Sequence, residues 1–388
     1  MPRNVYVNRT SIVFNTLLNK IIILIFCTSI FVAIPRFVPT AGAEGDCAEA
    51  STFVKKAIAI GDGSKQEQEL YRKAITLCPQ LAEAHHNLAV LLVEAGDLDQ
   101  AKTEIVKALA LSDSAEFRLA LAHILVLKDD LEGAKSEYQM VLEKSPQNEK
   151  ALQGLSYIEL EKGDEQTSIE LLEQALEKNP LDEVSLYNRA VLAERTGNMD
   201  GAERFYKELL RVDPAHPQGV IRLAVLLRKM GHLAETKEIL DRAVKSGKKN
   251  NQFLALLAST SEELGNLEDA EVAYKKILAI KPDDEDALAS LASLYVSKRQ
   301  HQMALETLKS LFAVNEHSAR GHTVQGIAYV QLGKFVEARN SLQKAIEEDP
   351  TQAVAHYNLS LVYKHEGDRS LAEQELNRAK VLDPSIVE

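Results

Sequence analysis

The sequence predicts an all-α fold in which short helical hairpins stack into a solenoid. The first observation behind this prediction is the proline spacing, which follows one 34-residue count through Pro146, Pro180, Pro214, Pro282, Pro350 and Pro384. Pro79 joins the series if one residue is missing between it and Pro146. A fixed period in this range is typical of stacked repeats, because each repeat is too small to bury its own apolar face.

The second observation is what recurs between the prolines. They define ten repeats, at 48–81, 82–114, 115–148, 149–182, 183–216, 217–250, 251–284, 285–318, 319–352 and 353–386. Position 15 is glycine in seven repeats, which allows the left-handed backbone that ends a first helix. Small residues recur at positions 8 and 20, where helices can then cross closely. Proline at position 32 ends the second helix.

Two stretches carry a family resemblance. Ala84-His85-His86-Asn87-Leu88-Ala89 is followed by Gly96 and Ala101, and Ala355-His356-Tyr357-Asn358-Leu359-Ser360 by Gly367 and Ala372. This pattern resembles the tetratricopeptide repeat family over residues 48–386, which implies a right-handed α-solenoid of about ten hairpins. The usual tryptophan at position 4 is absent; His85, His322 and His356 stand there, and we expect them to pack. The first repeat is the most degenerate, as expected of an end cap.

The N-terminus predicts export. Residues 1–43 contain basic residues, an apolar stretch at 21–34 and a small-residue run that ends at Ala43, the order of a secretory signal. Cleavage after Ala43 and an uncleaved N-terminal anchor both stay open, and in either case the repeats at 44–386 lie in the periplasm or at the extracytoplasmic face of the membrane. The membrane is then contacted only through this segment. The acidic balance, net charge -12, argues against nucleic-acid binding.

Two cysteines, Cys47 and Cys78, stay with the exported part. They stand at the start of the first helix and the end of the second helix of repeat one, and an antiparallel hairpin brings these ends together. An even count in an oxidising compartment favours a disulfide bond, with two free thiols or a thiol-linked partner as the alternatives.

Motifs for catalysis or metal binding are absent from the sequence. No His-Glu-x-x-His, Gly-x-Ser-x-Gly or Cys-x-x-Cys arrangement is present, and the acids are spread at repeat spacing over helix surfaces. Gly61-Asp62-Gly63-Ser64-Lys65 lacks the spacing of a phosphate loop and is predicted to be a turn. We therefore predict no enzymatic activity, no cofactor and no metal.

The resemblance implies binding of proteins or peptides in a concave groove lined by the first helices. The groove-facing positions hold Asn87, His123, Tyr157, Tyr187, Asn188, Arg222, Arg228, Tyr357 and Asn358. Asparagine can bridge a peptide backbone, and tyrosine offers apolar area with a polar tip. The predicted function is a protein-binding adaptor of the cell envelope. The alternative is a scaffold that self-associates end to end through an apolar stripe of Leu376, Ala379 and Leu382.

A flexible seam is expected near residues 246–251. This junction, Ser246-Gly247-Lys248-Lys249-Asn250-Asn251, lacks the terminal proline and is polar. An ordinary junction with a substituted stop signal is the alternative.

Overall fold

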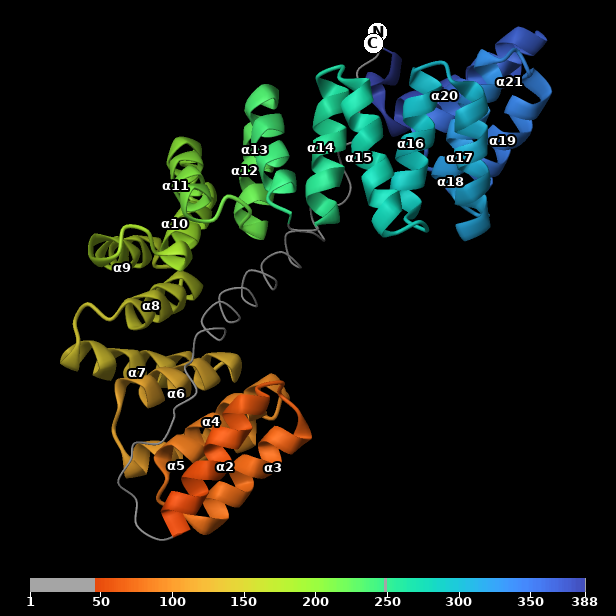
Figure 1. Cartoon of the computed structure of the whole chain (residues 1–388). Helices are drawn as coiled ribbons and strands as arrows, with labels where there is room; N and C mark the ends of the chain where they lie inside the picture. Colours follow the sequence, from red (N-terminus) through yellow and green to blue (C-terminus); the bar gives the residue numbers. More distant parts are fainter. Residues whose placement is uncertain (1–45, 248–249, 388) are drawn as a thin grey trace. The chain divides into compact units, whose positions relative to one another are not determined.

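The structure, a computed structural model, describes residues 46–247 and 250–387. The predicted signal or anchor segment, residues 1–43, lies outside these residues. The first helices of the repeats are α2 (Asp46–Ile60), α4 (Ala82–Glu94), α6 (Ala115–Leu127), α8 (Glu149–Glu161), α10 (Glu183–Arg195), α12 (Pro217–Lys229), α14 (Asn251–Glu263), α16 (Glu285–Ser297), α18 (Ala319–Gln331) and α20 (Ala353–Glu366). The second helices are α3 (Lys65–Leu77), α5 (Leu98–Leu111), α7 (Leu131–Lys144), α9 (Glu165–Lys178), α11 (Met199–Val212), α13 (Leu233–Lys245), α15 (Leu267–Ile280), α17 (His301–Val314), α19 (Phe335–Glu348) and α21 (Arg369–Leu382). The predicted all-α hairpin repeats are confirmed (Figure 1).

Local backbone chemistry sets the hairpin boundaries. The glycines at position 15, such as Gly163 with φ 85°, adopt the left-handed conformation after the first helix. An aspartate directly after this glycine then caps the second helix: the Asp97 carboxylate accepts from the Gln100 amide, and the Asp164 carboxylate accepts from the Thr167 amide. Gly61 and Gly63 likewise form the predicted turn of repeat one, and Ser64 caps α3.

Two repeats make the same turn without glycine. Asp129 with φ 62° and Arg299 with φ 58° occupy position 15 of repeats three and eight. A side chain in this region costs conformational energy, so the stacking of the flanking helices holds both residues in place. The glycine pattern alone marked only seven of these turns.

The core consists of small residues where helices cross and larger residues between them. The position-20 alanines Ala101, Ala134, Ala202, Ala270, Ala304 and Ala338 are fully buried, whereas Ala372 in the last repeat is half-buried. The ring of Tyr138 in α7 is buried against Gly154 in α8, where an added Cβ would stand 2.2 Å from the ring. Successive repeats are therefore packed with no room for one methyl group at this junction.

Ion pairs also connect successive repeats. The acids that begin the second helices reach a base in the next repeat: Glu132 contacts Lys162 at 2.6 Å, Glu268 contacts Lys298 at 3.3 Å, and Asp99 contacts Lys128. These acids therefore have specific partners in the neighbouring repeat. Because the acids are exposed, each pair contributes little to stability.

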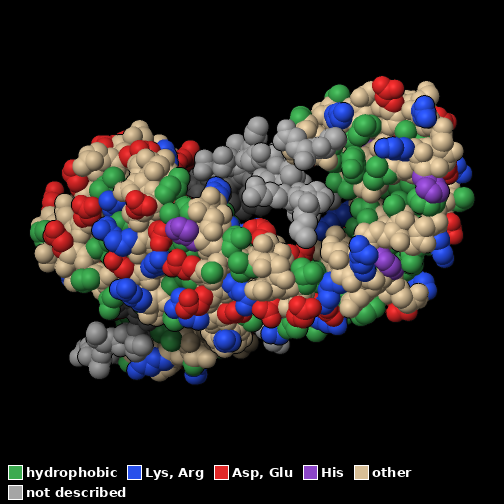
Figure 2. Space-filling model, turned by 90° about the horizontal axis from the view of Figure 1, so that it is seen from above, with side chains coloured by type: hydrophobic (Ala, Val, Ile, Leu, Met, Phe, Trp, Pro, Cys, Tyr) green, Lys and Arg blue, Asp and Glu red, His purple; other side chains and the backbone are tan. Residues whose placement is uncertain are grey.

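The described chain divides into two compact bodies, residues 46–212 and 213–387. Within the C-terminal body, α13 packs against α14 on the two sides of the expected seam. The seam itself stays a prediction, since Lys248 and Lys249 are outside the described residues. On the face shown in Figure 2, acidic and basic side chains are interspersed with apolar ones.

The two ends of the array are finished differently. In repeat one, a disulfide joins Cys47 to Cys78, with the Cα atoms 4.9 Å apart. In repeat ten, the short helix η1 (Pro384–Val387) packs against α21 and α20. The expectation of an exposed apolar stripe on α21 is therefore wrong. Ala379 is buried, and Leu376 and Leu382 are half-buried.

Candidate interaction surface

The first helices of successive repeats contact one another and form what we call the first-helix face. In the N-terminal body α4 contacts α6 and α6 contacts α8; in the C-terminal body α12 contacts α14, α16 contacts α18 and α18 contacts α20. All nine residues predicted to line a groove belong to first helices, α10 included. Whether they contact a partner stays a prediction.

In the N-terminal body the structure buries the predicted residues. Asn87 on α4, His123 on α6, Tyr157 on α8, and Tyr187 and Asn188 on α10 are all less than a tenth exposed. The Tyr187 ring lies 6.3 Å from that of Tyr206 on α11. The described structure gives the Nδ2 of Asn188 no hydrogen-bond partner. These side chains offer little accessible surface, so the exposed part of the candidate surface lies elsewhere.

In the C-terminal body the predicted residues are half-buried. Arg222 and Arg228 lie on α12, and Tyr357 and Asn358 lie on α20. Arg228 pairs with Glu263 of the next repeat, and Asn358 donates to the Val354 carbonyl of its own helix at 2.8 Å.

Apolar side chains accompany these polar groups. Val225 on α12 and Leu361 on α20, both at position 9, are each 38% exposed. This body therefore presents accessible apolar and polar groups on the same helices.

A polar network that the sequence did not indicate also lies in the C-terminal body. The Tyr274 hydroxyl of α15 donates to Glu262 of α14 at 2.6 Å, and Arg320 of α18 donates to the Ser290 hydroxyl of α16 at 2.9 Å. Arg320 also lies 3.8 Å from Asp286. The Tyr274–Glu262 bond joins the two helices of repeat seven, and the Arg320 contacts join repeat nine to repeat eight.

Burial governs the protonation of this network. It raises the pKa of Glu262 above its ordinary value, partly opposed by the hydrogen bond from Tyr274. Burial, together with the nearby Glu262 carboxylate, also raises the pKa of Tyr274. The tyrosine therefore stays a neutral donor at physiological pH, and the network has the form of a structural bridge.

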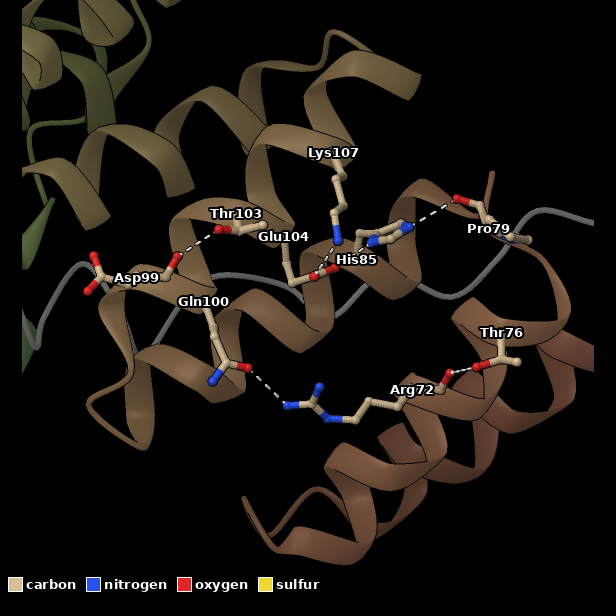
Figure 3. A network of polar contacts seen from close by, with 9 residues as sticks. All are labelled: Arg72, Thr76, Pro79, His85, Asp99, Gln100, Thr103, Glu104 and Lys107. Carbon is tan, nitrogen blue, oxygen red and sulfur yellow. Dashed lines mark hydrogen bonds and ion pairs between the residues drawn. The ribbon is translucent and has the colours of Figure 1, made fainter.

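The position-4 histidines are buried, as expected, but they also make polar contacts. Figure 3 shows the His85 ring between Glu104 of α5 and the carbonyl group of Pro79. Its Nδ1 lies 2.6 Å from Glu104 Oε2, and its Nε2 lies 3.0 Å from the Pro79 oxygen. Lys107 contacts the other oxygen of the same carboxylate at 2.8 Å. The pairing of position 4 with position 23 was the signal that sequence reasoning missed.

Residues 46–247 and 250–387 contain neither a metal-binding cluster nor a membrane-spanning helix. No group of three or more His, Cys, Asp and Glu side chains in this part of the chain is placed to hold a metal ion. None of the helices described there has the length and apolar character needed to cross a membrane.

Comparison with protein families gives matches along most of the array. Models described as tetratricopeptide repeat match residues 70–103, 154–219 and 193–259, and one described as TPR repeat matches 326–367. The chain belongs to the tetratricopeptide repeat family. A model of the anaphase-promoting complex, cyclosome, subunit 3 matches residues 266–345 of this TPR protein.

Curated relatives match over short stretches. Protein bimA of Emericella nidulans is 28% identical over 119 residues, 30% of this chain and 15% of bimA. Cellulose synthase operon protein C of Pseudomonas fluorescens is 29% identical over 26% of this chain and 8% of its own. The type IV pilus assembly protein PilF of Pseudomonas aeruginosa is 38% identical over 15% of this chain and 23% of PilF. The TPR array thus spans less than a quarter of the length of each of these relatives.

Solved structures are similar at low identity. PilF of Pseudomonas aeruginosa has a TM-score of 0.44 at 20% identity, covering 52% of this chain and 92% of PilF. MamA of Desulfovibrio magneticus has a TM-score of 0.38 at 20% identity, covering 45% of this chain and 98% of MamA.

Proposed function

We propose that this TPR protein is a non-enzymatic protein–protein interaction adaptor of the cell envelope, which binds peptide segments or partner helices on its first-helix face. The observation that carries the proposal is the composition of that face in the C-terminal body. Half-exposed Val225 and Leu361 lie on the same helices as Arg222, Tyr357 and Asn358. Apolar groups supply buried area, and the polar groups can satisfy a peptide backbone.

The envelope location is part of the same proposal. It is supported by the signal-like order of residues 1–43 and by the disulfide between Cys47 and Cys78, since such bonds persist in oxidising compartments. Relatives named for type IV pilus assembly and for a cellulose synthase operon agree with a role in secretion, pilus or polysaccharide-export machinery. Proteins or peptides would be the partners, and no cofactor is needed.

Photocrosslinking tests the proposal. A photoreactive residue is placed at Val225, Tyr357 or Leu361 on the first helices, and at Val272 or Val336 on the second helices as matched exposed controls. We expect crosslinks to discrete envelope proteins from the first-helix positions only. Crosslinks from both sets alike, or only from the controls, would contradict the assignment of the binding face.

Self-association through the ends is the second candidate. It is favoured by two exposed apolar residues of α21, Val381 at 74% and Leu371 at 37% exposure. Light scattering over a concentration series distinguishes the two: growth of the mass with concentration, abolished by Val381→Lys, supports the scaffold. A mass that stays that of the monomer at high concentration rules it out.

A further inference from the structure

Three histidines stand at the same position of three repeats, and their surroundings differ in one respect. The Nε2 of His85, His322 and His356 lies 2.9 to 3.1 Å from a backbone carbonyl oxygen six residues earlier, that of Pro79, Glu316 or Pro350. Each of these carbonyl groups belongs to position 32 of the preceding repeat. The histidine therefore connects its own first helix to the end of the repeat before it.

The difference lies at the second ring nitrogen. Nδ1 of His85 faces Glu104 at 2.6 Å, and Nδ1 of His356 faces Glu375 at 2.5 Å; both glutamates stand at position 23 of the same repeat. In repeat nine that position is Ser341, which donates to Gln325, and the described structure gives Nδ1 of His322 no partner. His322 is instead stacked on Phe312, with the ring centroids 4.5 Å apart.

Proton counting separates the two situations. A neutral imidazole has one N–H and one lone pair, whereas a carbonyl oxygen and an ionised carboxylate only accept hydrogen bonds. The surroundings of His322 are satisfied by a neutral ring with the proton on Nε2. Those of His85 and His356 need a second proton, between Nδ1 and the carboxylate.

Other repeats support the same rule. Arg118, a permanent cation, stands at position 4 of repeat three and contacts Glu137 at position 23 at 2.7 Å. Where position 4 is Leu152, Leu186 or Val220, position 23 is apolar. In these four repeats the pocket between the two positions holds either a cation with an acid or two apolar side chains.

We propose that His85 and His356 are proton-dependent latches that hold the first helix of repeats two and ten to the second helix of the same repeat, and that loosen this contact when the ring loses its second proton. His85 faces Glu104, with Lys107 behind it, from α5, and the Pro79 carbonyl from the turn after α3 (Figure 3). His356 faces Glu375 from α21, where Arg378 lines the same surface hollow, and the Pro350 carbonyl from the turn after α19. The two latches join α4 to α5 within repeat two and α20 to α21 within repeat ten.

The carboxylates agree with this assignment. Burial raises the pKa of Glu104, but its hydrogen bonds with Lys107 and His85 outweigh burial and lower that pKa overall. The Glu104 carboxylate is therefore ionised, and the second proton belongs to the His85 ring. The contact between Nδ1 and the carboxylate therefore depends on this second proton.

Hydrogen exchange of the full chain between pH 5 and 8, corrected for the intrinsic rate, tests the proposal. In the native protein we expect opening of α4–α5 and α20–α21 to increase roughly tenfold or more over this range, because a charge-assisted hydrogen bond is lost. Repeat nine, with His322, supplies the internal control, and its opening should stay constant. Equal responses of repeats two, nine and ten would overturn the proposal.

Two variants sharpen the test. In Glu104→Gln and Glu375→Gln the amide can donate to Nδ1 of a neutral ring, so the contact survives without the extra proton. We expect the pH dependence of the corresponding repeat to disappear, and its persistence in both variants contradicts the latch. If a variant does not fold, ¹⁵N imidazole spectra of the native protein decide: His85 and His356 should keep both ring nitrogens protonated to higher pH than His322. Titration of all three together refutes it.

Discussion

Substitution of Gly154 by alanine probes the packing between repeats three and four. A Cβ at this position stands 2.2 Å from Cζ of Tyr138 and 2.5 and 2.6 Å from two further ring atoms. Carbon atoms pack at about 3.5–4.0 Å, so the ring has to move by more than about 1 Å. The Tyr138 ring is only 1% exposed, and neighbouring side chains must move with it.

Helix propensity and overpacking make opposite contributions to the change in stability that this substitution causes. Alanine is preferred over glycine in a helix interior by about 1 kcal/mol. Overpacking of a buried site costs about 1–3 kcal/mol and occasionally more. Because all three ring contacts fall below 3.0 Å, the cost lies at the upper end, and we expect Gly154→Ala to destabilise the α7–α8 junction by about 1–2 kcal/mol.

Hydrogen exchange measures this junction directly, since solenoid repeats open locally. The matched control is Gly154→Ala in a Tyr138→Leu background, where the ring that causes the clash is gone and the cost should largely disappear. The packing argument would be refuted if the Gly154→Ala protein were as stable as the native protein, or if it were more stable because alanine has the higher helix propensity.

Three further predictions follow from the turns, the disulfide and the acid response. Asp129→Gly and Arg299→Gly should each stabilise the protein by about 0.5–1 kcal/mol, because glycine removes the left-handed backbone cost; a lower melting temperature for both would contradict this. Cys47 and Cys78 are 31 residues apart in the sequence. Reduction of their disulfide should destabilise repeat one by roughly 3–4 kcal/mol on the chain-entropy model, and hydrogen exchange should become faster in α2 and α3 alone. The hydrogen bonds from Lys275 and Lys298 lower the pKa of Glu271 from 4.5 to about 2, so its contribution is present above pH 4.5 and is lost as the pH falls toward 2. Acid unfolding of Glu271→Gln should show a shallower loss of stability over this range, and an unchanged curve would count against the pair.

The periodic features of the fold could be predicted because local chemistry dictates them. Proline at position 32 and glycine at position 15 act within their own turns, so their spacing alone gave the ten hairpins. Asp129 and Arg299 were not recognised as left-handed turns, since neighbouring helices impose that conformation and the residue types do not signal it.

The candidate surface could be predicted less fully from the sequence. Position numbers placed Asn87, Tyr157 and Asn188 on first helices, but their burial depends on how closely the helices approach. The same holds for the network of Glu262 and Arg320, whose parts come from different repeats. Only the pairing of positions 4 and 23 left a trace in the sequence, visible once the contact is known.

The measurement that tests the binding account most directly is the affinity of a crosslinked partner segment for two matched variants. Val225→Arg with Leu361→Arg alters the first-helix face, and Val272→Arg with Val336→Arg alters exposed valines of second helices by the same chemistry. We predict that titration calorimetry gives a Kd at least about tenfold larger for the first variant, because one or more well-packed anchor residues are lost. The Kd of the second variant should be unchanged. Unchanged affinity in the first variant, or equal losses in both, would contradict a partner site on the first-helix face.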